Sequence, residues 1–340
     1  MQKTIAKEHA EKKGISKPVG ISIAVICSLI AIAILIFHKN QFADPQDELI
    51  KKIIASVIII IGNFAFAFLY DKITVLPVEL FQNRRLIWKL SKNDFKTRYA
   101  GSYLGIVWAF VQPVVTILVY WFVFEKGFSA KAQVLATGIE VPYVLYLTAG
   151  MVPWFFFNEA TMNGMTALLE YNYLVKKVVF KISILPIIKI IAATFIHIFF
   201  ICFMLLLNIG YGYYPDLYWL QIIYFSFCLI VFVLAISYAT CSIVIFFRDL
   251  TQIISIFMQV GMWATPIMWD INRIPEKYQI IFKLNPVYYV VNGYRSALFD
   301  KSWFWEDFYS TMFFWITTVV IFAIGALIFK RLKVHFADVL

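Results

Sequence analysis

The residues of this sequence that are best suited to chemistry are cations at helical spacing. Arg85, Lys89, Lys92 and Lys96 fall on one side of a helical wheel. The other side carries apolar residues, namely Leu80, Phe81, Leu86, Ile87, Trp88, Leu90 and Phe95. A helix divided in this way lies in the membrane interface, with its charged ends among the lipid headgroups. We predict an amphipathic interfacial helix over residues 79–101, although Arg98 falls on its apolar side.

Three further ionisable residues lie inside apolar runs. These are Glu159, Lys189 and His197. An ionisable side chain within a membrane span indicates a functional site by default. The alternatives are structural: Glu159 pairs with Lys189, Lys189 extends to the interface, and His197 forms a hydrogen bond between helices.

The composition predicts a polytopic membrane protein that is entirely α-helical between its loops. Of its 340 residues, 62 % are hydrophobic and only 15 % are charged, and the mean hydropathy is +0.79. These values are too apolar for a soluble domain of this length. The net charge of +10 is spread over short segments between apolar runs, which argues against nucleic acid as a partner. The four cysteines lie inside apolar runs without metal-ligand spacing, so we expect no metal site.

Eight apolar runs are long enough to be read as spans. The run from Ser102 to Phe124 is free of charge over 23 residues, which covers a hydrocarbon core of about 30 Å at about 1.5 Å per residue. The eight runs are residues 19–37, 53–70, 102–124, 142–168, 184–208, 219–247, 251–269 and 308–329. With the N-terminus inside, cytoplasmic segments hold 19 Lys and Arg residues and outer segments hold ten. We therefore expect both termini in the cytoplasm.

Three segments depart from a simple series of spans. Residues 170–181 form a short amphipathic piece between two spans on the expected cytoplasmic face. Residues 270–300 contain Pro275, Pro286 and apolar stretches too short to cross, which predicts two half-helices dipping into the outer leaflet. Pro266 predicts a broken end to the span before them.

A set of ordered motifs resembles the permease subunits of type-2 ABC exporters for lipid-linked polysaccharides, such as wall teichoic acid, O-antigen and capsular polymers. The resemblance covers about residues 79–340 and is nearest to the teichoic acid exporters. It rests on Tyr103-Leu-Gly-Ile-Val-Trp108 with Pro113, Tyr120-Trp-Phe-Val-Phe124, Pro153-Trp-Phe-Phe-Phe-Asn158, Phe247-Arg248-Asp249, Thr265-Pro-Ile-Met268, Asn285-Pro-Val-Tyr-Tyr289, Gly293-Tyr-Arg295 and Phe336-Ala-Asp-Val-Leu340. The resemblance implies a six-helix core over residues 102–340, whereas residues 1–78 carry two additional spans.

The resemblance also implies partners and a mechanism. The dipeptide Gly-Lys of a phosphate-binding loop is absent from the sequence, so the chain is expected to be no enzyme and to bind no cofactor itself. ATP and Mg²⁺ belong to a separate ATPase subunit. The other expected partners are a second copy of the chain, membrane lipids and a polysaccharide on undecaprenyl diphosphate. The expected location is the plasma or inner membrane.

The resemblance suggests candidate roles for four groups of residues in this sequence. Coupling to the ATPase falls to Glu170, Tyr171, Asn172, Lys176 and Lys177, with Arg248 and Asp249 as a local ion pair that also contacts the ATPase. Attraction of the lipid diphosphate falls to Arg85, Lys89, Lys92, Lys96 and Arg98, for which interfacial anchoring is an equal explanation. The candidates for the sugar path are Tyr120, Trp121, Trp154, Phe155, Glu159 and Trp263, although an aromatic residue of this sequence is more often a packing or interfacial belt residue. The outer gate is assigned to Pro275, Asn285, Pro286, Tyr289 and Arg295.

Two other classes of protein compete with this interpretation. An ion-coupled secondary transporter usually shows inverted repeats and broken helices in matching halves, but only one interrupted region is present, near the C-terminus. A membrane-embedded glycan-processing enzyme usually carries a metal-binding Asp-x-Asp pair, which is missing. The identity of the sugar and the role of the first two spans do not follow from the sequence.

Overall fold

The computed structural model describes residues 17–37, 45–98, 101, 103–128, 133–134, 140–176 and 181–339. The chain divides into two compact units, Met1–Gln82 and Asn83–Leu340. Each unit is described by itself below.

The first unit is a helical hairpin followed by a short helix. Its elements are α2 (Lys17–Phe37), α3 (Pro45–Ile73) and α4 (Val75–Gln82). Helices α2 and α3 pack together where Gly20 meets the ring of Tyr70, because a Cβ on Gly20 would lie 2.1 Å from the Tyr70 hydroxyl. Most other apolar side chains of the hairpin are exposed, as expected of helices solvated by lipid.

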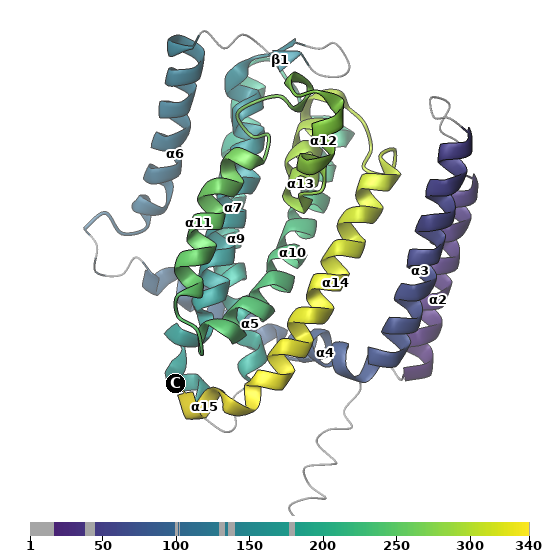
Figure 1. Ribbon diagram of the computed structural model, residues 1–340. Coiled ribbons are helices and arrows are strands. Elements are labelled where there is room, and N and C mark those ends of the chain that lie inside the picture. Colours follow the sequence, from purple (N-terminus) through teal and green to yellow (C-terminus); the bar gives the residue numbers. More distant parts are fainter. Residues whose placement is uncertain are drawn as a thin grey trace, which may run out of the picture. The chain divides into compact units, whose positions relative to one another are not determined.

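The second unit is a bundle of long helices with two short strands (Figure 1). The predicted helix of residues 79–101 is divided by Asn83, so that only α5 belongs to this unit. The helices of eight or more residues are α5 (Arg84–Arg98), α6 (Trp108–Trp121), α7 (Tyr143–Glu170), α9 (Leu185–Gly210), α10 (Gln221–Val244), α11 (Leu250–Ala264), α12 (Glu276–Lys283), α13 (Pro286–Arg295) and α14 (Phe308–Leu332). Two four-residue helices, α8 (Asn172–Val175) and α15 (Phe336–Val339), and the antiparallel strands β1 (Gln133–Val134) and β2 (Glu140–Val141) complete the regular structure of the described residues, together with short 3₁₀ and π turns.

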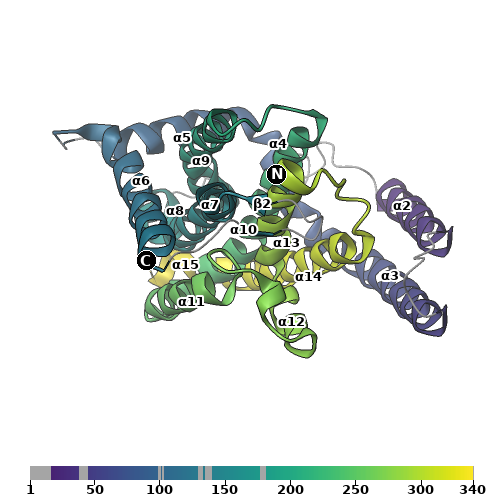
Figure 2. The ribbon, with the colours of Figure 1, turned by 90° about the horizontal axis from the view of Figure 1, so that it is seen from above.

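Helix α7 is the centre of this bundle. It packs against α6, α9, α10, α11 and α13, and Figure 2 shows it among these neighbours along the bundle axis. Its buried residues occupy all sides of the helix, whereas α11 has no buried residue. The consequence is that α7 tolerates polar residues at membrane depth, since protein rather than lipid surrounds them.

Five of the described helices are long and apolar enough to cross a membrane. They are Lys17–Phe37, Gly105–Gly127, Ile182–Gly210, Leu217–Val244 and Phe308–His335. The predicted spans at residues 53–70 and 251–269 correspond to shorter apolar helices, Lys52–Phe68 and Leu250–Ala264. Helix α7 has the length, at 28 residues, but is too polar to meet the same criterion. The all-α membrane fold is confirmed, with fewer fully apolar spans than the eight predicted.

The predicted break at Pro266 is present. Helix α11 ends at Ala264, and Thr265 adopts an extended conformation with ψ of 129°. Two short helices follow, α12 and α13, as expected for residues 270–300. Helix α13 packs between α7 and α10 and is therefore part of the bundle interior.

Candidate functional site

A cluster of charged side chains joins α5, α7 and α9 at the end of the bundle where α8 lies. Its centre is Asp94, which is 6 % exposed. One carboxylate oxygen, Oδ1, accepts hydrogen bonds from Lys189 Nζ at 2.6 Å and from the Tyr171 hydroxyl at 2.6 Å. The other oxygen, Oδ2, accepts from Arg98 Nη2 at 3.3 Å. We call Asp94, Arg98, Glu159, Glu170, Tyr171 and Lys189 the Asp94 cluster.

The helices place these groups by simple spacing. Ile87, Ser91 and Asp94 form the buried face of α5, which packs on α9, so Asp94 points at Lys189. Glu170 is the last residue of α7 and Tyr171 its C-cap. Lys189 Nζ also donates to Glu170 Oε2 at 2.6 Å and lies 4.9 Å from the centre of the Tyr171 ring. The first turns of α9 are thereby tied to both α5 and the end of α7.

Glu159 belongs to a second ion pair of the cluster. Its carboxylate accepts a hydrogen bond from Arg98 Nη1. The predicted pairing of Glu159 with Lys189 is therefore wrong. The reason is distance along α7: eleven residues separate Glu159 from Glu170, which is about 16 Å of helix, and Lys189 lies at the level of Glu170.

The charges of the cluster stabilise one another. Three carboxylates face two cations, so the cluster has an excess of one negative charge. Burial and the hydrogen bond to Asp94 raise the pKa of Tyr171, which keeps its hydroxyl protonated as the donor. An open cavity of ≈ 310 Å³ adjoins the cluster and is lined by Asp94, Thr97, Arg98, Asn163, Glu170, Tyr171 and Lys189. Two acidic and two basic residues line this cavity, so its lining has no excess of either charge.

The basic side of α5 lies apart from this cluster. Arg85, Lys89, Lys92 and Lys96 are exposed, whereas Arg98 is 20 % exposed and its guanidinium is held by Asp94 and Glu159. Lys92 Nζ lies 5.2 Å from the centre of the Trp88 ring. Of the five cations predicted to act together, four are therefore exposed, and the fifth, Arg98, forms ion pairs inside the bundle.

Helix α8 projects from the bundle immediately after the cluster. Its Val175 is buried and fixes the helix, while Asn172, Tyr173 and Lys176 are exposed. Lys177 lies outside the described residues. The short amphipathic helix expected in residues 170–181 is present, since α8 has one buried anchor and an exposed polar side.

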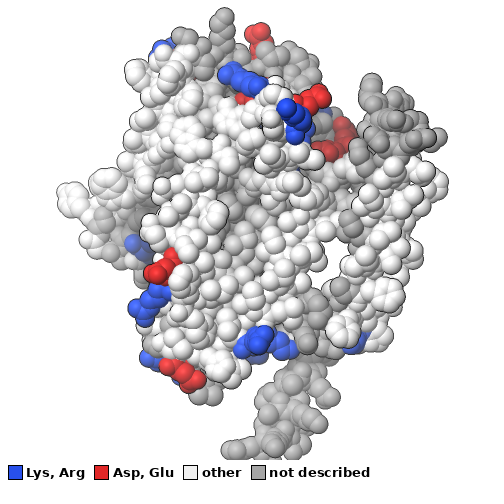
Figure 3. Space-filling model, viewed as in Figure 1, with Lys and Arg blue, Asp and Glu red and all other residues white. Residues whose placement is uncertain are grey.

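Arg248 and Asp249 lie exposed in the turn between α10 and α11. The predicted ion pair between them is not formed. Successive residues of a turn direct their side chains to different sides, which explains the error. On the face shown in Figure 3, the charged residues of this unit lie towards its two ends, with a broad uncharged band in between.

The aromatic residues assigned to the sugar path lie on three helices. Tyr120 and Trp121 are half-buried on α6, and Trp121 Nε1 donates to Glu125 Oε2 at 2.5 Å. Trp154 is buried and packs towards Gly261 of α11, whereas Phe155 faces Phe200 of α9. Trp263 is 57 % exposed. Neighbouring Trp154 and Phe155 thus point to different sides of α7, and their channel role stays a prediction.

The three polar residues assigned to the outer gate, Asn285, Tyr289 and Arg295, each form hydrogen bonds with other parts of the bundle. Arg295 is 2 % exposed and donates to the carbonyl oxygens of Pro266 and Ile267 at 2.7 and 2.6 Å. Its guanidinium lies over the Tyr146 ring at 3.6 Å. Gly150 permits this approach, because a Cβ there would lie 2.9 Å from Arg295 Nη2. Two carbonyl groups of the turn that follows α11 are therefore satisfied by a cation at the end of α13.

The other gate residues begin the short helices. Pro275 and Asn285 are the N-caps of α12 and α13, and Pro286 occupies the first turn of α13. The Asn285 side chain accepts from the Val287 amide at 3.0 Å and donates to Thr265 Oγ1 at 2.8 Å. Buried Tyr289 makes hydroxyl contacts with Tyr224 and Thr311 at 3.2 and 2.9 Å. These contacts brace α13.

Sequence reasoning missed Asp94 and Gln221. Asp94 lies four residues before Arg98 and on the same helix face as Ile87 and Ser91. A carboxylate on the apolar face of an amphipathic helix indicates a buried ion pair, so Asp94 could have been identified from the sequence. Gln221 donates to the Ser302 carbonyl at 2.9 Å and accepts from the Phe304 amide at 2.7 Å. No pattern in the sequence links residues 81 positions apart in this way.

Comparison with known proteins gives consistent matches. Residues 85–299 match the family described as ABC-2 type transporter. The chain is 26 % identical over 257 residues to the O-antigen export system permease protein RfbA of Klebsiella pneumoniae, an alignment that covers 75 % of this chain and 95 % of that protein. It is 27 % identical over 264 residues to the RfbA protein of Myxococcus xanthus, covering 76 % and 97 %. It is 22 % identical over 210 residues to the polysialic acid transport protein KpsM of Escherichia coli, covering 60 % and 78 %.

Proposed function

The chain belongs to the ABC-2 type transporter family, and on that basis we propose that it is the permease subunit of an ATP-driven exporter that moves polysaccharide linked to undecaprenyl diphosphate outward across the plasma or inner membrane. The observation that carries the proposal is the match of residues 85–299, which begins in α5 and ends after α13. Two relatives are named as O-antigen permeases and one as a polysialic acid transporter, which supports an O-antigen-like polymer as cargo. The alternative of a teichoic acid polymer comes from the sequence resemblance alone.

The ATPase of this exporter is a separate subunit, and α8 is its docking helix. Helix α8 is short, exposed on its polar side and anchored by Val175. Such a helix transmits a rigid-body movement into the helices to which it is tied. Helix α8 is connected directly to α5, because Tyr171 immediately precedes α8 and its hydroxyl donates a hydrogen bond to Asp94 of α5.

We propose the following transmission. Movement of the ATPase displaces α8, and Tyr171 and Glu170 pass this displacement to Asp94 and Lys189. Helices α5 and α9 then move with α7, because all three share the Asp94 cluster. Arg248 and Asp249 lie exposed in a separate turn and form a second contact with the ATPase.

The lipid diphosphate is attracted by the exposed cations of α5. Arg85, Lys89, Lys92 and Lys96 supply this charge at the cytoplasmic surface, each contributing about 1 kcal/mol towards an anionic headgroup. Arg98 is removed from this set, since its guanidinium is occupied by two carboxylates. Both termini are cytoplasmic in this proposal, and two copies of the chain enclose the path of the polymer.

The experiment is ATP hydrolysis by the chain co-purified in lipid with the ATPase encoded beside it, measured with and without undecaprenyl-diphosphate-linked polymer. The wild-type complex is expected to respond to the polymer. The double variant Lys176→Glu and Lys177→Glu is expected to uncouple hydrolysis from polymer, and Lys330→Glu, an exposed residue at the end of α14, is the matched control. Failure to form a complex, with no ATPase response, would overturn the proposal.

A further inference from the structure

Two adjoining hollows lie at the end of the bundle where α12 and α13 meet the loop before α14. One cavity has ≈ 60 Å³ and the other ≈ 180 Å³, and both are lined by Lys283, Tyr288 and Asn292. One water molecule requires about 10–15 Å³, so each hollow has room for more than a single water. We call the two adjoining hollows together the α13 recess. The residues of the first hollow that matter most below are Phe225, Tyr288, Asn292, Ser296, Trp303 and Phe304.

One wall of the recess is a polar stripe. Tyr288, Asn292 and Ser296 follow one another at intervals of four residues along α13 and the π turn that continues it, so they share one face. None of these three side chains forms a hydrogen bond with any residue that the structure describes. An amide and two hydroxyls thus keep their full capacity to donate and accept.

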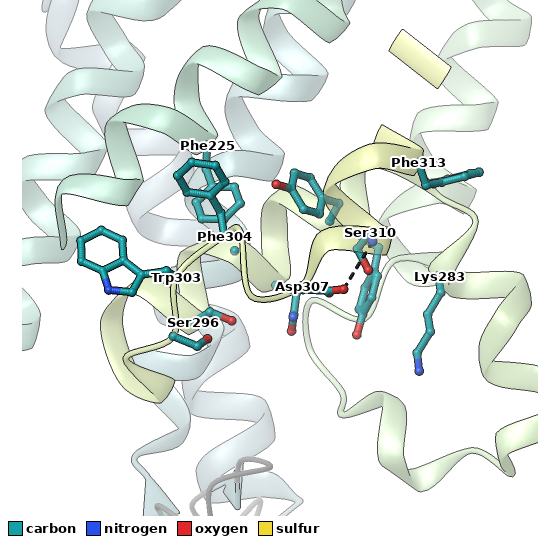
Figure 4. A pocket seen from close by; sticks show the side chains of 13 residues that line it. Phe225, Lys283, Ser296, Trp303, Phe304, Asp307, Ser310 and Phe313 are labelled. Atoms are coloured by element: carbon teal, nitrogen blue, oxygen red, sulfur yellow. Dashed lines mark hydrogen bonds between the residues drawn. The ribbon is translucent and has the colours of Figure 1, made fainter. Parts of the chain in front are cut away.

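The facing wall is aromatic. Phe225 comes from α10, and Trp303 and Phe304 come from the loop after α13, as Figure 4 shows. The Trp303 ring stacks on Trp305 at 4.5 Å and the Phe304 ring on Tyr224 at 3.9 Å. Gln221 holds the backbone on both sides of Trp303, at Ser302 and Phe304. The aromatic wall is therefore fixed before any ligand arrives, which lowers the ordering cost of binding.

The charges around the recess do not favour an anion. Asp270, Asp300 and Asp307 line the two hollows together with Lys283 and Arg295. Acidic groups exceed basic ones by one. One oxygen of Asp307 accepts from the Ser310 amide at 3.3 Å, which Figure 4 marks, and the other is left to accept from a ligand hydroxyl.

A sugar ring has the chemistry that matches these walls. Its C–H faces pack on aromatic rings, and the hydroxyls around its edge pair with amide, hydroxyl and carboxylate groups. We propose that the α13 recess binds one uncharged sugar unit of the exported polymer, within a single copy of the chain. This inference rests on the proposed function, because it takes the exported polymer as the ligand. The recess would hold the emerging chain between cycles and oppose its return.

The test is a binding titration on the complex of this chain with its ATPase in lipid nanodiscs. The probe is an oligosaccharide fragment released by mild acid hydrolysis from the surface polysaccharide of the producing cell. Intrinsic tryptophan fluorescence reports binding, since Trp303 lines the recess. Tyr288→Phe and Asn292→Ala each remove polar groups without enlarging a side chain. Tyr278→Phe is the matched control, because Tyr278 is 48 % exposed on α12 and lines neither hollow.

The wild-type complex is expected to give a saturable fluorescence change that Trp303→Phe abolishes. Tyr288→Phe and Asn292→Ala are each expected to raise the Kd about fivefold, which corresponds to about 1 kcal/mol, while Tyr278→Phe leaves the Kd unchanged. Thermal unfolding of each variant identifies any that fails to fold, in which case Ser296→Ala replaces it. Absence of saturable binding, or equal weakening by Tyr278→Phe, overturns the inference. Polymer-stimulated ATP hydrolysis by the wild-type complex, measured separately, shows whether the proposed function has failed as well.

Discussion

Lys189 and Asp94 form a buried ion pair with 2.6 Å between Nζ and Oδ1, although 95 residues separate them in the sequence. The pair joins the first turns of α9 to the amphipathic helix α5. Both side chains are less than 10 % exposed, so each is the main compensation for the desolvation of the other.

Replacement of Lys189 by Met is expected to destabilise the protein by about 3–5 kcal/mol, because Asp94 then remains buried with only the more distant Arg98 as a cationic partner. Thermal unfolding of the purified chain in detergent measures the change. The exposed Lys330→Met is the control and should be nearly neutral. Adding Asp94→Asn to Lys189→Met should restore much of the loss, and a double variant no better than the single one would argue against a direct pair.

Tyr171→Phe is expected to weaken coupling more than it weakens folding. The change removes one hydrogen bond to the Asp94 carboxylate, worth about 1.5–3 kcal/mol, and retains the ring. In the complex with the ATPase, hydrolysis should continue while its response to polymer falls. Tyr173→Phe, a change at the 57 % exposed neighbour on α8, should leave this response intact. If the two variants behave alike, the hydroxyl of Tyr171 is not the link.

The exposed cations of α5 are expected to affect the response to polymer, whereas Arg98, which pairs with Asp94 and Glu159, is expected to affect stability. Lys89→Gln and Lys92→Gln are each expected to raise the polymer concentration that gives half-maximal ATPase stimulation about fivefold. Each cation contributes about 1 kcal/mol to the binding of an anionic headgroup, and the loss of that free energy corresponds to this factor. Arg98→Gln should instead lower the unfolding temperature, since Glu159 and Asp94 lose a partner. A large change in half-maximal concentration with no change in stability for Arg98→Gln would contradict this division.

Arg295→Lys is expected to cost about 1–3 kcal/mol of stability. A lysine ammonium lacks the planar fork that reaches the carbonyl oxygens of Pro266 and Ile267 together, so one buried acceptor is left unpaired. Denaturation in detergent measures the loss, with the exposed Arg273→Lys as control. Equal stability of the two variants would show that water satisfies the broken end of α11.

Local patterns in the sequence predicted much of this architecture. Charge spacing predicted α5 as amphipathic, Pro266 predicted the end of α11, and Pro275 and Pro286 predicted two short helices. Each of these features depends on residues within a turn or two of one another. The resemblance to type-2 ABC transporters is confirmed by the family match.

The pairings between distant segments were not predictable in the same way. From the sequence, Glu159 could form an ion pair with either Arg98 or Lys189. It pairs with Arg98 because of how far α7 is shifted along its axis relative to α5 and α9, and the sequence does not reveal this shift. The position of Trp154 against α11 similarly depends on helix rotation, which a helix buried on all sides does not reveal through its apolar pattern.

The separation of Asp94 from Lys189 has a consequence for biosynthesis. At about 5–20 residues per second, the ribosome adds the 95 intervening residues in roughly 5–20 s. During that interval Asp94 is in the nascent chain without Lys189, and only Arg98 is available as a cationic partner. If α5 lies in the membrane interface, as its sequence predicts, water can solvate the Asp94 carboxylate until α9 is inserted. The ion pair is therefore a late event in assembly, and its formation marks the completion of the α5–α9 contact.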